Sequence, residues 1–168
     1  YMREALPYFR SVEILPAAPG AVYARFYEQD RHDPVDAFSI AEGDIQLLLL
    51  LTALFSEPAD QPAILLLDEP ECSLHPWAIS VLARAMTEAA RSWKRQVLLA
   101  THSPVLMSQF EPDSIVVCER ADGASLMRRL SDVEEVRDLL DQYAVGALYM
   151  SELIARQSRS VDPPEATL

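Results

Sequence analysis

The most constraining stretch of this chain runs from Ile64 to Pro76 and reads ILLLDEPECSLHP. Four apolar residues end in two adjacent carboxylates, Asp68 and Glu69, and a proline then interrupts the chain. A short apolar run of this kind predicts a strand buried on both faces, as in the parallel sheet of an α/β domain. The two acids therefore lie at the carboxyl end of the strand, where open α/β sheets bind their ligands.

The two acids suit phosphate chemistry. One carboxylate at a strand end can hold Mg²⁺ together with phosphate oxygens, and its neighbour can activate a water molecule. We assign Asp68 to the first role and Glu69 to the second. A dedicated metal cluster is the alternative, because Glu71, Cys72 and His75 are also potential ligands. Such a cluster usually shows ligand pairs at fixed spacing and a further contributor elsewhere, which this sequence lacks, so the shared Mg²⁺ is favoured.

Two further stretches carry potential chemistry. Gln96–Ala100 predicts the next buried strand, and Thr101-His102-Ser103 follows it at the same kind of strand end. Asp44–Phe55 is apolar on all sides, which predicts a helix buried in a large core. Gly43 precedes that helix, and free backbone N–H groups beside a glycine can bind an anion. Alternatively, an acid at this end, Glu42 or Asp44, simply caps the helix and compensates its dipole.

Together these motifs resemble the ATPase head of ABC-type proteins in the SMC/RecF-like branch, including its stand-alone AAA-type members. LLLDEPECSLHP is similar to the Walker B strand and D-loop, Leu98–Pro104 to the switch strand with its histidine, and Ile40–Gln46 to the signature motif. The resemblance extends from about Val12 to Leu153. It implies a P-loop NTPase-like α/β fold, with a mainly parallel sheet core, flanking helices and an N-terminal antiparallel β meander.

The resemblance also implies roles for single residues. Asp68 would hold Mg²⁺, Glu69 would be the catalytic base, and His102 would contact the γ-phosphate and position the attacking water. The signature-like loop Ala41-Glu42-Gly43-Asp44 would reach the ATP of a partner in a head-to-head homodimer, and Ser73, in the D-loop, would lie along that interface. The family usually has a serine where this chain has Ala41, which argues against efficient γ-phosphate sensing.

A phosphate-binding loop of the form GxxxxGK[ST] does not occur in the sequence, which has four glycines and a single lysine, Lys94. That loop supplies the N–H cradle and lysine for the β- and γ-phosphates. We therefore expect residues 1–155 to be the C-terminal half of a head whose Walker A portion lies in an N-terminal segment or a separate chain. The start at Tyr1 instead of methionine likewise suggests a longer or trimmed polypeptide.

The remaining elements follow from local patterns. Residues 1–40 predict a short helix within 1–10 and a meander of strands at Val12–Leu15, Ala21–Gln29 and Val35–Ser39, with a turn at Pro16–Gly20. Within 41–155 we expect the following elements: a loop at Ser56–Pro62, a helix at Pro76–Ser92, strands at Ser114–Cys118 and Ala124–Arg129 around an Asp122-Gly123 turn, and helical segments at Val133–Asp141 and Ala144–Ile154. Residues 156–168 predict a flexible tail.

The composition limits which partners the chain is expected to bind and in which cellular compartment it is expected to occur. The net charge is −12, and the basic residues are scattered, so this acidic segment is not expected to bind DNA, and DNA contact is possible only through other parts of the full protein. Two cysteines 46 positions apart fit reduced thiols in the cytoplasm. The most apolar stretch, Ile45–Phe55, is eleven residues long, shorter than the roughly 20 that a membrane span requires.

The favoured function is ATP binding and hydrolysis by a dimerising head. Two alternatives remain open. One is a nucleotide-gated binding or scaffold module in which Ala41 has weakened hydrolysis. The other is the ATPase part of a DNA repair or phage-defence factor whose remaining domains do the effector chemistry.

Overall fold

The computed structural model describes residues 1–56, 62–121 and 123–154. The chain divides into two compact units, Tyr1–Gln109 and Phe110–Leu168. Each unit is described by itself below. The first unit contains all the motifs that suggested phosphate chemistry.

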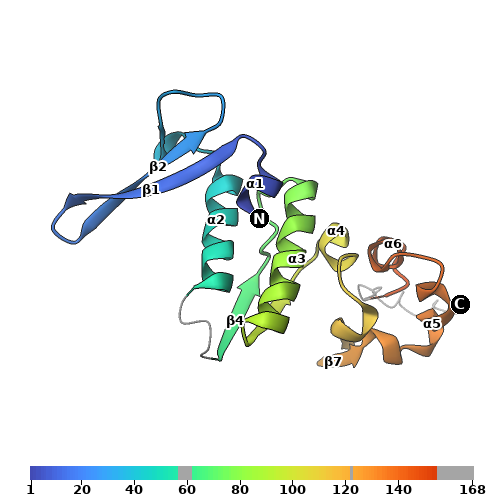
Figure 1. The fold of residues 1–168 in the computed structure, drawn as a ribbon. Coiled ribbons are helices and arrows are strands. Elements are labelled where there is room, and N and C mark those ends of the chain that lie inside the picture. Colours follow the sequence, from blue (N-terminus) through green and yellow to red (C-terminus); the bar gives the residue numbers. More distant parts are fainter. Residues whose placement is uncertain (57–61, 122, 155–168) are drawn as a thin grey trace, which may run out of the picture. The chain divides into compact units, whose positions relative to one another are not determined.

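The first unit begins with α1 (Met2–Ala5) and an antiparallel sheet. In that sheet β2 (Ala21–Glu28) lies between β1 (Phe9–Ala18) and β3 (Val35–Asp36). Figure 1 shows β1 and β2 side by side as a long hairpin. The predicted β meander is therefore confirmed. Pro16 fits inside β1 because β1 is an edge strand, where a missing N–H group disrupts no second ladder.

Several boundaries in this region were predicted wrongly. Pairing continues to Ala18↔Ala21, so the turn predicted at Pro16–Gly20 is confined to the last two of those residues, and Gly20 supplies a φ of +77°. The first helix ends at Ala5 and not near residue 10. The third strand ends at Asp36 because Ala37–Ser39 forms a 3₁₀ turn. Cross-strand pairing and short-range turns, which local propensity does not resolve, set these limits.

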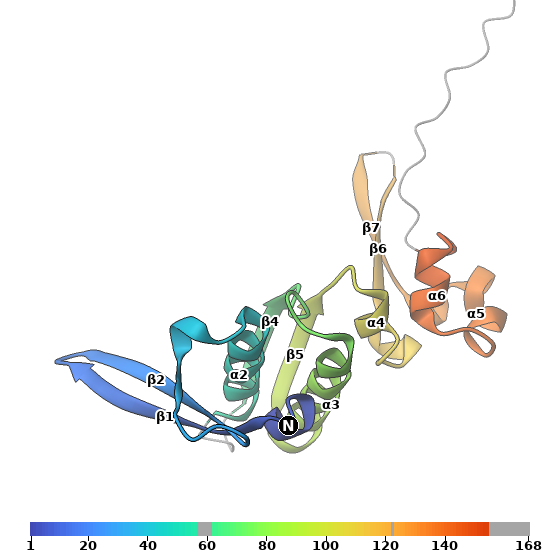
Figure 2. The same cartoon turned by 90° about the horizontal axis from the view of Figure 1, so that it is seen from above.

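The core of the first unit is a two-stranded parallel sheet. β4 (Ala63–Asp68) pairs with β5 (Arg95–Ala100) from Ala63↔Arg95 to Asp68↔Ala100. α2 (Glu42–Phe55) and α3 (Pro76–Ser92) lie side by side against this sheet (Figures 1 and 2). The buried apolar side chains of the two helices are Leu47, Leu51, Leu54, Ala78, Ile79, Val81, Leu82, Ala83, Ala85, Met86 and Ala89. This parallel pair with flanking helices confirms the α/β class.

The sheet is covered on one face only, which corrects the prediction of strands buried on both faces. Ile64, Leu66 and Leu98 are 66%, 76% and 48% exposed, and they alternate with partly buried neighbours along β4 and β5. The helix predicted to be buried on all sides is likewise buried on one side, since Leu49 in α2 is exposed. An apolar face of a parallel sheet is normally covered by further chain.

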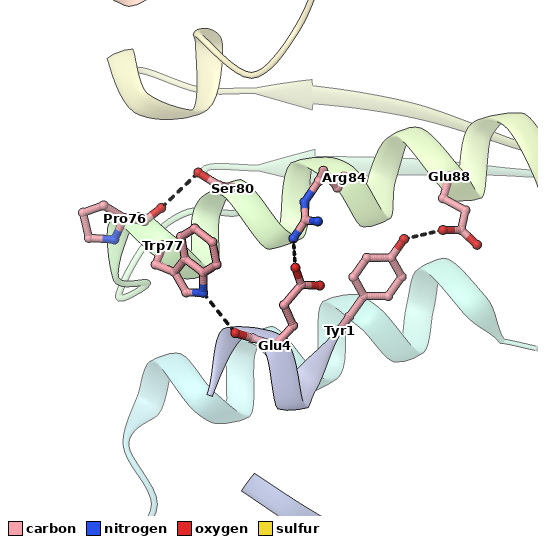
Figure 3. A network of polar contacts seen from close by, with 7 residues as sticks. All are labelled: Tyr1, Glu4, Pro76, Trp77, Ser80, Arg84 and Glu88. Carbon is pink, nitrogen blue, oxygen red and sulfur yellow. Dashed lines mark hydrogen bonds and ion pairs between the residues drawn. The ribbon is translucent and has the colours of Figure 1, made fainter. Parts of the chain in front are cut away.

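The helix α3 matches its predicted bounds, Pro76–Ser92, because its start is encoded locally. Pro76 occupies the first helical position, and His75 Nδ1 accepts the N–H of Trp77 at 3.2 Å. The N-terminal segment packs against this helix (Figure 3): the Tyr1 hydroxyl donates to Glu88, and Trp77 Nε1 donates to the Glu4 carbonyl at 3.0 Å. An ion pair between Glu4 and Arg84 adds to these contacts.

After β5 the first unit ends with the short helix α4 (Pro104–Met107). The second unit holds a hairpin of β6 (Val116–Ala121) and β7 (Ala124–Arg129), followed by α5 (Glu134–Leu140) and α6 (Val145–Met150). The hairpin confirms the predicted pair of strands, with Gly123 at a φ of +80°. Both helices are shorter than predicted.

Most of the predicted Ser56–Pro62 loop, residue Asp122 of the hairpin turn and the predicted tail 156–168 lie outside the described residues. Within the described ranges, no helix has the length and apolar character needed to cross a membrane.

Candidate functional site

The carboxyl edge of the β4–β5 pair gathers the acids and the histidine that the sequence singled out. Asp68 is the last residue of β4 and lies opposite Ala100, the last residue of β5. Glu69 and His102 follow these strand ends directly, and Glu69 Oε1 lies 3.8 Å from His102 Nε2. Residues 33 positions apart in sequence therefore share one small area because two parallel strands end together.

The backbone of Glu69 is turned to make this arrangement. Its N–H donates to the Ala100 carbonyl at 2.9 Å, which extends the strand ladder by one bond, and its φ is then +44°. A left-handed conformation costs a residue with a β-carbon roughly 1–2 kcal/mol. The buried Pro70 follows, and the Cys72 N–H donates to the Glu69 carbonyl at 3.1 Å. Strain of this kind is concentrated at functional sites.

Both side chains of the Glu69–His102 pair can be reached from solvent. The His102 side chain is 83% exposed and that of Glu69 is 36% exposed. Their separation of 3.8 Å is longer than a direct hydrogen bond but short enough for a shared water molecule. A carboxylate and an imidazole so placed can together orient and deprotonate water.

Asp68 offers one exposed carboxylate for a cation. Among the described residues, no three histidine, cysteine or acidic side chains are grouped closely enough to form a complete metal site. A single carboxylate fits Mg²⁺, which usually takes one or two protein carboxylates and completes its shell with water and phosphate oxygens. Asp68 would therefore hold the ion jointly with a nucleotide, and the ion would neutralise developing phosphate charge.

The loop from Ala41 to Asp44 starts α2, with Ala41 as its N-cap residue and no side-chain cap. A β-carbon built on Gly43 would lie 2.2 Å from the Ser73 carbonyl oxygen, so the absence of a side chain lets these two loops touch. Gly43 thus has a packing role besides the anion-binding role predicted from sequence. The Ser73 backbone is left-handed at this contact, with a φ of +63°.

The two acids of this loop have different environments. Glu42 is exposed, whereas Asp44 Oδ2 accepts a hydrogen bond of 2.6 Å from the Tyr8 hydroxyl. Burial raises the pKa of Tyr8, and the hydrogen bond to Asp44 and the charges of Asp44 and Glu28 raise it further. The side-chain cap considered for these acids is not observed, because neither occupies the N-cap position, but both lie in the first turn of α2, where acids compensate the helix dipole.

Sequence reasoning missed several residues that hold the site together. Gln46 Nε2 donates to the Pro70 carbonyl at 3.2 Å and so joins α2 to the turn after β4. Glu71 is buried and accepts a hydrogen bond from the Thr101 hydroxyl at the end of β5. The strongest available signal was the second glutamate in the DEPE stretch, which could not be distinguished from a surface acid without its contacts.

Comparisons with known proteins bear on the fold and the family of the chain. Twelve solved chains match the structure. One of them, from work described as "Structural biochemistry of ATP-driven dimerization and DNA stimulated activation of SMC ATPases", is 17% identical with a TM-score of 0.59, over 83% of this chain and 84% of that one. This similarity supports the P-loop NTPase-like fold. No curated protein matches the chain.

A family model described as "AAA domain, putative AbiEii toxin, Type IV TA system" matches residues 4–108. The match spans the antiparallel sheet, the Ala41–Asp44 loop, the Asp68-Glu69 pair and His102, which are the parts of the first unit described above. This chain therefore belongs to that family of AAA domains, a class of nucleotide-binding ATPases.

Proposed function

We propose that this chain supplies the water-activating half of an ATP-hydrolysing head that dimerises around two nucleotides. The observation that carries the proposal is the 3.8 Å approach of Glu69 to His102 beside Asp68, at the sheet edge where α/β proteins bind ligands. Asp68 would hold Mg²⁺, Glu69 would accept a proton from the attacking water, and His102 would orient that water against the γ-phosphate.

Two observations support a division of the head into halves. The sequence has no phosphate-binding loop, and the apolar side chains of Ile64, Leu66 and Leu98 are exposed on a parallel sheet. Further strands or helices carrying that loop would cover this face.

The proposed dimer would be a symmetric pair in which the Ala41–Asp44 loop of one protomer faces the γ-phosphate bound at Asp68 of the other. The helix α2 is 14 residues long, and the free backbone N–H groups at its N-terminus would make that contact. The Ser73 turn packs directly on Gly43, so the D-loop and this loop would meet the partner together. Any DNA contact of the full protein would lie outside this acidic segment, and we place the protein in the cytoplasm.

The decisive test is Glu69→Gln in the polypeptide or complex that also carries a phosphate-binding loop. Loss of the base should lower kcat by about 10²–10³-fold, while ATP binding persists and the dimer is trapped. Glu13→Gln, in the exposed part of β1, is the control and should leave turnover unchanged. Unchanged turnover in Glu69→Gln would exclude Glu69 as the base.

Calorimetric titration of this chain alone with ATP and Mg²⁺ tests the division into halves. We expect no measurable heat of binding, since the phosphate cradle lies elsewhere. Micromolar binding would show that residues of this chain hold the phosphates, and the division would then be wrong.

A nucleotide-gated scaffold with weak hydrolysis is the second candidate, and one observation favours it. The N-cap residue of α2 is Ala41, without the hydroxyl that would contact phosphate, and acids follow it at Glu42 and Asp44. An Ala41→Ser variant separates the two functions. A gain of tenfold or more in turnover supports the scaffold, and no gain supports a competent ATPase.

A further inference from the structure

The described residues include one buried carboxylate that the proposed hydrolysis does not use. Glu71 lies in the turn after β4 and is 8% exposed. Its Oε2 atom is buried without a hydrogen-bond partner in the described part of the chain. Burying a carboxylate is costly unless it is paired, so the single bond that it makes deserves a functional explanation.

That bond begins a chain of contacts that runs past His102. The Thr101 hydroxyl donates to Glu71 Oε1, and Thr101 Oγ1 in turn accepts the N–H of Ser103 at 2.9 Å. Ser103 Oγ then accepts the N–H of Leu106 at 3.2 Å and caps α4. Thr101 and Ser103, the residues on both sides of His102, are therefore held by a connected set of hydrogen bonds that includes Glu71.

The His102 side chain differs from its neighbours because it is 83% exposed. His102 lies between Thr101 and Ser103 in the chain, so the hydrogen bonds of these two residues fix the backbone from which the imidazole extends. Hydrogen bonds to a buried carboxylate are stronger than neutral ones and are well suited to this task.

The turn that carries Glu71 is itself held in place. The Leu74 N–H donates to the Glu71 carbonyl at 3.0 Å, and the Pro70 carbonyl accepts from Gln46 of α2. The buried Glu71 is therefore a stationary anchor relative to β4 and α2. Through its hydrogen bond with Thr101, the Glu71 carboxylate holds the loop after β5 in place relative to β4 and α2.

We propose that Glu71 is a positioning residue that orients His102 toward Glu69 by holding Thr101. This inference rests on the proposed function, because it assigns the role of Glu71 in the same ATP hydrolysis. Glu71 neither accepts the proton from water nor holds the ion in this scheme. It restricts the loop so that the 3.8 Å separation of Glu69 and His102 is maintained.

The test uses the complete ATPase, and Thr101 variants are the primary probes. Thr101→Val keeps the shape but removes the hydroxyl, and kcat should fall about 10–100-fold, since a small misplacement of catalytic groups costs up to about 10²-fold. KM for ATP should change less than about threefold, because the binding groups are untouched. Thr101→Ser restores the hydroxyl and should restore kcat.

A double-mutant cycle separates positioning from general stability. In a His102→Ala background, Thr101→Val should have no further effect on kcat, because the residue through which Thr101 acts is gone. Glu71→Met, of similar size but without an acceptor, should behave like Thr101→Val in both backgrounds. An additive loss in the cycle, or a Thr101→Val enzyme with normal kcat, would overturn the role assigned to Glu71.

Amide hydrogen exchange provides a readout independent of catalysis. Protection of the Ser103 N–H should fall at least about tenfold in Thr101→Val and persist in Thr101→Ser, since this N–H donates to Thr101 Oγ1. Unchanged protection would overturn the proposal even if turnover were lost. Failure of the proposed function is distinct, because wild-type protein would then lack ATP hydrolysis or Glu69→Gln would retain it.

Discussion

Gly43 and Ser73 touch so closely that a single methyl group would separate them, because a β-carbon on Gly43 would lie 2.2 Å from the Ser73 carbonyl oxygen. This contact joins the loop at the start of α2 to the turn after β4, which carries Glu69 and Glu71. The parts of the candidate site that come from distant segments are thus in direct backbone contact. A substitution at Gly43 should disturb both loops.

Gly43→Ala should destabilise the protein by about 1–3 kcal/mol, because the new methyl group must displace backbone. Urea unfolding of the variant and of the wild type measures this difference. The sign of the change in unfolding free energy tests the contact, because helix propensity alone would make Ala more stable than Gly by up to about 1 kcal/mol. Ala53→Gly, at an exposed position of α2, calibrates the propensity effect, and a stabilised Gly43→Ala would contradict the contact.

Arg95 is buried at the start of β5 and bonds to the end of α2, where its guanidinium donates to the carbonyls of Leu54 and Ser56. Arg95→Met keeps the apolar stem but removes the charged donor from the buried Leu54 carbonyl and the part-buried Ser56 carbonyl, which should cost about 1–3 kcal/mol. Thermal unfolding should show a corresponding drop in Tm. The exposed Arg91→Met is the control, and an equal effect in both would contradict a specific role for Arg95.

Tyr8 should make the free energy of unfolding fall with pH in the alkaline range. Burial and the Asp44 carboxylate raise its pKa in the folded state above the ordinary value of 10. The folded state therefore holds a proton that the unfolded state releases, so this contribution is present below pH 10 and is lost as the pH rises above 10.

Urea midpoints measured from pH 7 to 11 test the Tyr8 prediction. Tyr8→Phe has no hydroxyl to titrate, so its midpoint should fall less steeply above pH 10 than that of the wild type. Tyr23→Phe, whose ring lies beside Arg25, is the matched control and should follow the wild type. Identical slopes for Tyr8→Phe and wild type would rule out a titrating Tyr8–Asp44 bond.

His102→Ala should reduce kcat of the complete ATPase by about 10²-fold with little change in ATP affinity, because the role proposed for the exposed imidazole is to orient the attacking water. Steady-state kinetics and nucleotide titration measure the two effects separately. His75→Ala is an informative comparison, because His75 caps α3 and its loss should lower stability by about 1 kcal/mol. Equal turnover of His102→Ala and wild type would exclude His102 from the reaction.

Local sequence signals determined the elements that carry the candidate site. The apolar run before Asp68 and the one before Thr101 each predict a strand with polar residues at its carboxyl end, and Pro76 after His75 predicts the start of α3. Each signal lies within a few residues of the feature it specifies, so it does not depend on the rest of the fold. The α/β class follows from these elements, whereas the 3.8 Å approach of Glu69 to His102 also required β4 and β5 to pair with their ends in register.

Only the tertiary structure decided which side chains are buried and which distant groups meet. The burial of Glu71, the bond from Arg95 to α2 across 41 positions, and the contact of Gly43 with Ser73 all depend on how separate elements pack. The exposure of the apolar face of β4 and β5 is likewise a result of packing that only the tertiary structure revealed. A repeated apolar pattern indicates that a face of the strand will be buried. Which segment covers that face depends on how the elements pack, and local sequence does not specify it.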